Sequence, residues 1–173
     1  KVPNEKAAAL LYLLMPGVPT VYYGEELGMS GSGRDENKRL PMVWSSDAAT
    51  QCKAPADADQ AQRLTDGVAE QDSDPDSLLN WYRQLIALRN LAPELTRGEM
   101  AALDSGNNAI CAYTMTDAGS TVAVISNISQ NDTVSVSLDE LSGAELLGSI
   151  GGADWADGTA NLPPLSAIIV RLP

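Results

Sequence analysis

The chain has 173 residues, with 11 lysines and arginines against 23 aspartates and glutamates, no histidine, and a formal net charge of −12. Because so acidic a surface repels phosphate backbones and anionic lipids, we expect neither nucleic acid nor a membrane as a partner. The absence of histidine excludes His-based catalytic triads and most catalytic zinc sites from this chain.

The N-terminal region predicts a helix followed by a strand. Residues 7–15 (AAALLYLLM) are apolar on every side, so we expect a helix that is buried nearly all round, with Asn4 as its N-cap. Pro16-Gly17 ends it, since proline cannot donate the next backbone hydrogen bond. Residues 18–24 (VPTVYYG) are rich in β-branched and aromatic residues and predict a short buried strand. Helix, tight turn and strand together are typical of an α/β fold.

A long irregular stretch separates this strand from the next helix. Residues 25–72 contain several glycines and prolines and little periodicity, which favours a functional or flexible loop. Helical spacing returns after Asp74, a candidate cap, and ends at Pro93. The two cysteines, Cys52 and Cys111, favour two separate buried thiols over a single disulfide.

Beyond Gly98 the pattern changes to short alternating apolar runs separated by glycine- and asparagine-containing turns. This pattern predicts an antiparallel β-sandwich, and we place the domain boundary at about Arg97. Residues 98–173 carry nine acids and a single base, Arg171. The predicted strands are EMAAL, ICAYTM, TVAVIS, TVSVSL and AIIVRL.

Three motifs in the first half resemble glycoside hydrolase family 13, the α-amylase and α-glucosidase family. They are MPGVPTVYYGEELGM at residues 15–29, RDENKRLPMVWS at residues 34–45 and DPDSLLNWYRQLIALRNLAPEL at residues 74–95. The resemblance implies that residues 1–97 are the C-terminal end of a (β/α)8 barrel, comprising helix 7, strand 8 and helix 8. Residues 98–173 would then be the small β-sandwich called domain C.

The resemblance also implies a function. The parent protein would be a retaining α-glycosidase acting on starch-type glucans or maltooligosaccharides, by double displacement. Its three catalytic carboxylates are expected before Lys1, so we predict no catalytic residue in this chain and no activity for it alone. The missing N-terminal part of the barrel and an α-glucan or oligosaccharide are the expected partners. No cofactor is expected here, whereas calcium stays open for the parent, and the sequence does not fix the cellular location.

Two other functions stay open at this stage. One is a non-catalytic family member that acts as a binding or scaffolding protein, and the other is a carbohydrate-binding module formed by residues 98–173. Against the module, residues 1–97 make little sense outside a barrel, because a strand that is apolar on both faces needs parallel neighbours. For the same reason, we expect the isolated chain to aggregate.

Glu25 and Glu26 follow the predicted strand at the end where barrel active sites form. A retaining glycosidase needs two carboxyl groups about 5 to 5.5 Å apart across the scissile bond. Adjacent residues of an extended chain point to opposite faces, so these two cannot both address one bond. We therefore predict that both glutamates brace the loop.

Arg39 is the candidate substrate-binding residue. In Arg-x-Pro-Met-x-Trp the proline holds the residue before it extended, so the loop is stiff, and a guanidinium is a rigid fork for hydroxyls or a carboxylate. In the exo-acting glucosidases of the family, the arginine at this motif position helps close the terminal sugar subsite, and the resemblance implies that role for Arg39. The alternative is an ion pair with Asp35 that only staples the loop.

Three aromatic residues are candidate sugar platforms or packing residues. Tyr23 and Trp44 could stack on a sugar face, although burial within a barrel is the commoner fate of such residues. Trp155, in the predicted turn GGADWADG, is a surface platform or an edge-packing residue. The run DSDPD at residues 72–76 imitates the start of a calcium loop, but Ser77 and Arg83 occupy the positions of the loop's glycine and closing glutamate, so no metal ligand is predicted.

Overall fold

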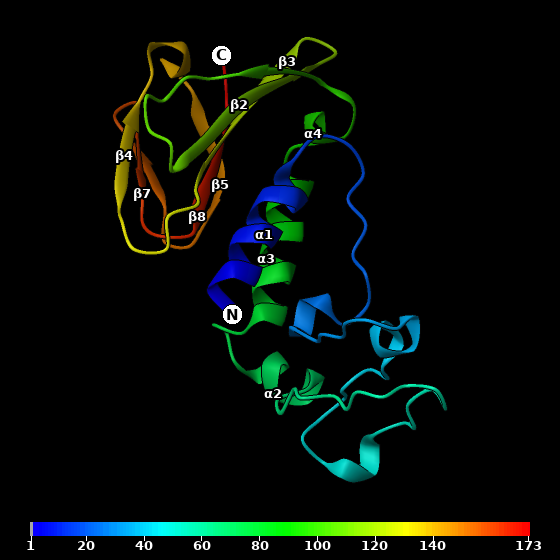
Figure 1. Ribbon diagram of the computed structural model, residues 1–173. Coiled ribbons are helices and arrows are strands. Elements are labelled where there is room, and N and C mark those ends of the chain that lie inside the picture. Colours follow the sequence, from blue (N-terminus) through cyan, green and yellow to red (C-terminus); the bar gives the residue numbers. More distant parts are fainter. Residues whose placement is uncertain (1) are drawn as a thin grey trace. The chain divides into compact units, whose positions relative to one another are not determined.

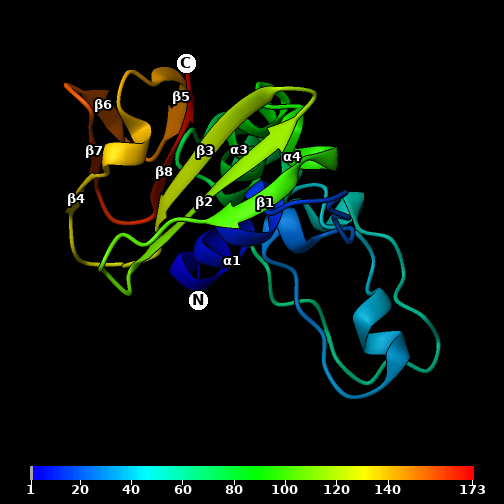
Figure 2. The ribbon, with the colours of Figure 1, turned by 90° about the horizontal axis from the view of Figure 1, so that it is seen from above.

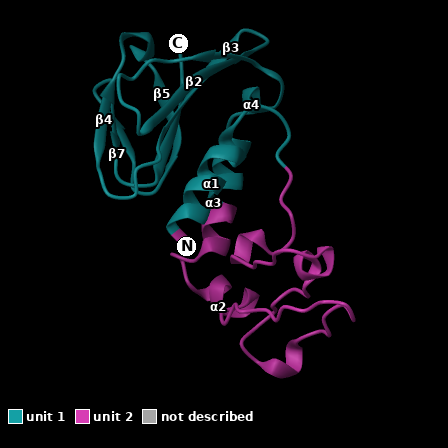
Figure 3. Ribbon diagram, viewed as in Figure 1, with its two compact units in different colours: residues 1, 3–19, 84–173 teal, residues 2, 20–83 magenta. Residues whose placement is uncertain are grey.

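The computed structural model describes residues 2–173, which form two compact units (Figure 3). Residues 3–19 and 84–173 form one unit, and residue 2 with residues 20–83 forms the other. Among residues 2–173 no helix is both long enough and apolar enough to cross a bilayer. The α-helices are α1 (Val2–Leu14), α2 (Val68–Ser73), α3 (Leu78–Asn90) and α4 (Glu94–Arg97).

The strands of the first unit confirm the predicted antiparallel sandwich (Figure 1). One sheet has the order β1-β2-β3-β8-β5 and the other the order β4-β7-β6, and every pair is antiparallel. Figure 2 shows β1, β2 and β3 side by side in the larger sheet. The strands are β1 (Glu99–Ala102), β2 (Ile110–Asp117), β3 (Ser120–Asn127), β4 (Val134–Ser137), β5 (Glu145–Ile150), β6 (Asp154–Ala156), β7 (Thr159–Leu162) and β8 (Ser166–Arg171).

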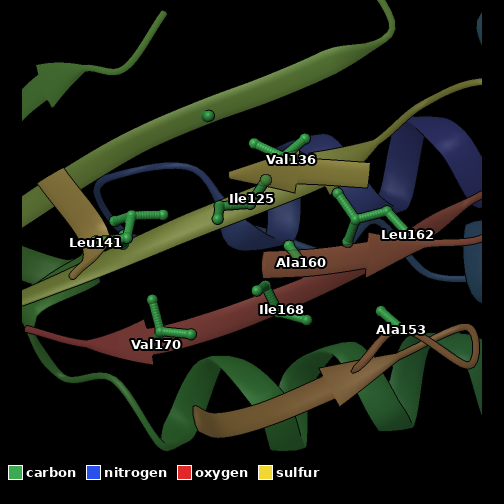
Figure 4. Close-up of a cluster of buried hydrophobic side chains, with 10 residues drawn as sticks. Ile125, Val136, Leu141, Ala153, Ala160, Leu162, Ile168 and Val170 are labelled. Atoms are coloured by element: carbon green, nitrogen blue, oxygen red, sulfur yellow. The ribbon is translucent and has the colours of Figure 1, made fainter. Parts of the chain in front are cut away.

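The core of the sandwich lies between the two sheets. Ile125 and Ile168 of the larger sheet pack with Val136 and Leu162 of the smaller one (Figure 4). Ile125, Ile168 and Leu162 have no exposed surface. This packing explains the alternation in the sequence, because every second side chain of a strand faces the partner sheet. The short helix η4 (Asp139–Leu141) adds Leu141 to the same core.

The sequence predicts a turn at Trp155, but the structure places this residue in strand β6. Its indole Nε1 donates a hydrogen bond to the Ala144 carbonyl at 3.0 Å, and its half-buried ring packs against the sandwich core. This arrangement matches the edge-packing alternative.

Helix α1 begins at Val2, so Asn4 lies inside the helix and is not its cap. Its burial is also less complete than predicted: Leu10 and Leu13 are buried, whereas Met15, just past the helix end, is about half exposed. Helix α3 begins four residues later than its predicted cap at Asp74. Ser77 is the cap instead, because its Oγ accepts a hydrogen bond from the Asn80 N–H at 3.2 Å.

Arg89 of α3 and Tyr113 of β2 satisfy the C-terminal carbonyls of α1. The buried Arg89 guanidinium donates to the carbonyls of Leu13 and Met15, each at 2.7 Å, and also to that of Gly17. The Tyr113 hydroxyl donates to the Leu14 carbonyl at 2.5 Å. Since the last carbonyls of a helix have no partner within the helix, these two side chains complete its end.

Residues 18–24 do not form the predicted strand. The segment is without helix or strand, Val18 is 82% exposed, and Tyr22 and Tyr23 are also exposed. A parallel strand is stable only when neighbours supply its hydrogen bonds, and residues 2–173 contain no strand that pairs with this segment. The apolar, β-branched segment is therefore unpaired, and its end at residues 22–25 is a turn.

Short helices and loops make up most of the second unit. The 3-10 helices are η1 (Glu25–Leu27), η2 (Asp35–Arg39) and η3 (Ala48–Thr50). Helix α2, which the sequence did not predict, is anchored by backbone bonds from Val68 to Val43 and from Ala69 to Trp44. Gly67 is required there, since an added Cβ would lie 2.6 Å from the Val43 oxygen.

The two cysteines are free, as the sequence favoured. Cys111 is half-buried, and desolvation by burial raises the pKa of its thiol. Cys52 is exposed and not buried as expected, because it lies in the long loop that follows η3.

Candidate functional site

The candidate residues Tyr23, Glu25 and Arg39 lie on two neighbouring segments of the second unit. The Tyr23 hydroxyl donates to the Leu40 carbonyl at 3.1 Å, which ties the segment before η1 to the loop that follows Arg39. Leu40 is 3% exposed and adopts φ −58° and ψ 146°. That conformation is the one expected of a residue before proline, so the predicted extended backbone at this point is confirmed.

A cavity of about 560 Å³ lies beside these segments. Tyr23 and Glu25 line it on one side, and Asn37, Lys38 and Leu40 line it on the other. Its wall therefore combines an aromatic ring, a carboxylate and an ammonium, which are groups that can bind the hydroxyls and the apolar face of a sugar.

Arg39 lies at the end of η2, and its side chain is 63% exposed. Arg39 itself does not line the cavity, although its neighbours Lys38 and Leu40 do. Its Nη2 is 3.5 Å from Asp35 Oδ2, and Lys38 Nζ is 3.3 Å from Asp35 Oδ1. The ion pair that the sequence offered as an alternative is thus present. Exposed ion pairs contribute only about 0–1 kcal/mol, so this pair leaves the Arg39 guanidinium free to exchange Asp35 for another acceptor.

Glu25 and Glu26 lie in a turn of 3-10 helix and not in extended chain, which corrects the geometry assumed from the sequence. Gly24 and Gly28 flank η1 with φ of 87° and 79°, a left-handed conformation that glycine adopts readily. With three residues per turn, adjacent side chains diverge by about 120° rather than pointing oppositely. Glu25 lines the cavity, whereas the half-buried Glu26 does not.

Trp44 and Tyr23 are about half exposed, at 51% and 44%. Neither is buried, although burial is the commoner state of such residues in a barrel. Trp44 lies outside the lining of the cavity, while Tyr23 packs against Tyr22 with ring centroids 5.1 Å apart. Of the two aromatic candidates, only Tyr23 is placed with Glu25 and the η2 loop.

Polar residues that the sequence did not single out hold this site together. Gln71 is buried; its Nε2 donates to the Leu27 carbonyl at 2.9 Å and its Oε1 accepts from the Leu79 N–H at 3.2 Å, which fixes the end of η1. Glu70 accepts from the N–H and Oγ of Ser46, and these bonds together outweigh desolvation and lower the pKa of its carboxyl. In the sequence, only a helical spacing at residues 68–73 could have indicated that Glu70 and Gln71 have a structural role.

No group of three or more cysteine, aspartate or glutamate side chains that could hold a metal ion occurs within residues 2–173. The run DSDPD at residues 72–76 is used otherwise: Asp74 Oδ1 accepts from the Asp76 N–H, and Asp72 pairs with Arg83. These are turn and surface interactions.

Comparison with known proteins identifies the family. The family model described as "Alpha amylase, catalytic domain" matches residues 1–98. Alpha-amylase 3 of Dictyoglomus thermophilum is 28% identical over 168 residues, and alpha-amylase SusG of Bacteroides thetaiotaomicron is 41% identical over 97 residues. The chain spans 34% of the length of the first relative and 14% of the second, and the alignments cover 96% and 55% of this chain.

A solved structure extends the likeness to nearly the whole chain. The structure "Eubacterium rectale Amy13B" matches with a TM-score of 0.91 and 34% identity, covering 99% of this chain and 34% of the other. The fold is accordingly the end of the catalytic barrel and the β-sandwich that follows it, even though the segment at residues 18–24 is unpaired. The chain therefore belongs to the α-amylase family.

Proposed function

We propose that this chain is the C-terminal part of a retaining α-glycosidase that hydrolyses α-glucosidic bonds in starch-type glucans or maltooligosaccharides. The catalytic carboxylates would come from the barrel segments that precede Lys1 in the parent protein. The observation that carries this proposal is the exposed Arg39 side chain, which lies between the cavity-lining residues Lys38 and Leu40 in a chain of the α-amylase family.

Arg39 would bind the substrate by donating hydrogen bonds to sugar hydroxyls. A guanidinium presents its donors in a planar fork, so it can bridge a hydroxyl and the Asp35 carboxylate at once. The 3.5 Å contact with Asp35 would orient the side chain before the substrate arrives. Because the pair is exposed and weak, its rearrangement on binding would cost little free energy.

The reaction itself would need groups from outside this chain. Double displacement requires one carboxylate as nucleophile and a second carboxyl as acid and base. Only Glu25 of this pair lines the cavity, so the two glutamates do not together supply the nucleophile and the acid/base there, which supports inactivity of the chain alone. The proposal leaves room for a bound calcium ion in the parent protein. Hydrolysis assays with and without a chelator would test whether activity depends on that ion.

The experiment is a hydrolysis assay of the whole parent protein on maltooligosaccharides and, separately, on α-1,6-linked oligosaccharides. We expect Arg39→Ala to lower kcat/KM at least about tenfold, equivalent to the loss of about 1.4 kcal/mol of transition-state binding. Arg63→Ala is the matched control: Arg63 is exposed in the same unit but lies outside η2 and its ion pair with Asp35, so kcat/KM should stay within twofold.

Three results would count against the proposal. A parent protein that hydrolyses neither substrate would be a non-catalytic family member with a binding or scaffolding role. Glucan binding retained by residues 98–173 without hydrolysis would favour the carbohydrate-binding module. Equal activity of the Arg39→Ala and Arg63→Ala variants would leave Arg39 as a loop staple paired with Asp35.

A further inference from the structure

Two polar segments of the second unit are joined to one another, and one of them carries Arg39. The first is the η2 segment, residues 31–39, and the second is residues 57–60, here called the 57–60 segment. Gln60 pairs with Ser32 through three hydrogen bonds of 3.1–3.2 Å. Arg34 donates to the Asp57 carbonyl at 3.1 Å, and its Nε is 3.8 Å from Asp59 Oδ2.

Asn37 is the centre of this contact. It is 2% exposed, and its amide group is fully used: Nδ2 donates to the Ser32 carbonyl and to Asp59 Oδ1, each at 2.8 Å. Its Oδ1 accepts from the backbone N–H groups of Asp59 and Gln60 at 3.1 and 3.2 Å. An asparagine amide offers two donors and one acceptor oxygen with two lone pairs, and here every one of them has a partner inside the contact.

The backbone geometry around Asn37 leaves little freedom. An added Cβ at Gly31 would lie 1.8 Å from the Asn37 carbonyl oxygen, so only glycine allows the start of the η2 segment to pass so close. In η2, Asn37 is the only buried residue and lies between Asp35 and Arg39. The position of the Arg39 backbone therefore depends on polar contacts made two residues earlier.

We propose that Asn37 is a positioning residue that holds η2, and with it the Arg39 guanidinium, in the geometry that binds substrate. This inference rests on the proposed role of Arg39 in substrate binding. Asn37 is the buried residue of η2 and is held there by hydrogen bonds. Loss of its amide would remove those bonds and let η2 shift. Displacement of a substrate-positioning group by about 1 Å can cost up to 10²-fold in rate.

A double-mutant cycle in the whole parent protein tests the proposal. We expect Asn37→Ala to lower kcat/KM about tenfold, mainly through KM, because the lost contact acts on binding. In an Arg39→Ala background the same substitution should have less than a twofold further effect, since Asn37 would act only through Arg39. A purely structural role would give the same loss in both backgrounds.

The matched control is Asn80→Ala. Asn80 also staples a loop of this unit, because its Nδ2 donates to the carbonyls of Gln71, Asp72 and Asp74 at 2.8–3.2 Å. It should change kcat/KM less than twofold.

The outcomes separate the inference from the proposed function. If Arg39→Ala is as active as the wild type, the proposed role of Arg39 fails. If Arg39→Ala is impaired and Asn37→Ala is not, or if the two effects multiply, only the positioning role of Asn37 is overturned. Should Asn37→Ala fail to fold, Gln60→Ala removes the Ser32 bonds while Asn37 stays in place, and the same cycle with Arg39→Ala decides the question.

Discussion

Replacement of Arg89 by alanine should destabilise the protein more than any surface substitution. The side chain is 8% exposed, and its guanidinium donates to carbonyls of Leu13, Met15, Gly17 and Leu95. Hydrogen bonds to a charged group contribute about 1.5–3 kcal/mol each, but they are not additive. Burial also lowers the pKa of Arg89, a sign that desolvation of the charge offsets part of the gain. We expect a net loss of about 3–5 kcal/mol.

Urea unfolding followed by circular dichroism measures this loss as a fall in the midpoint at constant slope. The control is Arg83→Ala on the same helix: that side chain is 52% exposed and pairs with Asp72, so we expect a change within about 0.5 kcal/mol. Arg89→Lys should be intermediate, because an ammonium lacks the fork that reaches several carbonyls. A loss below about 1 kcal/mol for Arg89→Ala, or equal losses for the two alanine variants, would refute the reasoning.

Three further predictions concern Glu94 and Trp155 of the first unit and Cys52 of the second. Desolvation by burial raises the pKa of the Glu94 carboxyl, but hydrogen bonds from Ser120, the backbone and Arg171, with the charge of Arg171, together outweigh it and lower that pKa. The stabilising contribution of Glu94 is therefore present above the ordinary glutamate pKa of about 4.3 and is lost as the pH falls through the lowered value. The urea midpoint should therefore drop as the pH falls below about 4.3, and less steeply in Glu94→Gln; equal slopes would contradict this. A thiol reagent at pH 8 should label the exposed Cys52 quickly and Cys111 slowly, and Cys52→Ser should abolish the fast phase. Trp155→Phe should cost about 1 kcal/mol of stability, through the lost bond to Ala144, and leave glucan binding unchanged; weaker glucan binding would restore the sugar-platform alternative.

The sequence predicted best the elements whose pattern reflects their own burial. Strands β2, β3 and β8 alternate or are continuously apolar, and all three were predicted from those patterns. Strands β5, β6 and β7 were missed for a physical reason. Strand β5 has a register shift between Leu146 and Gly148, and β6 and β7 have three and four residues, too few to show a period. Gly148 passes close to Leu88 and Leu91, where an added Cβ would lie 2.9 Å from either side chain, and sequence alone does not show such a contact.

The candidate site was only partly predictable. Arg39 and Tyr23 could be chosen because a motif marks them, and the conformation of Leu40 follows from the proline after it. Asn37 could not be chosen, because its partner Asp59 is 22 positions further along a loop without periodicity. The arrangement of Glu25 was misjudged since the turn of η1 depends on flanking glycines and hydrogen bonds rather than on side-chain pattern.

The Tyr113 and Glu94 contacts have a consequence for how this unit loses its structure. Tyr113 of β2 donates to the end of α1, and the buried Glu94 of α4 pairs with Arg171 of β8 at 3.0 Å. Buried side chains thus join α1 to β2 and α4 to β8. Because loss of either the helices or the sheet would leave these groups without partners, we expect both to unfold in one cooperative transition. A protease cut between Arg97 and Gly98 should leave two pieces that remain associated until that transition.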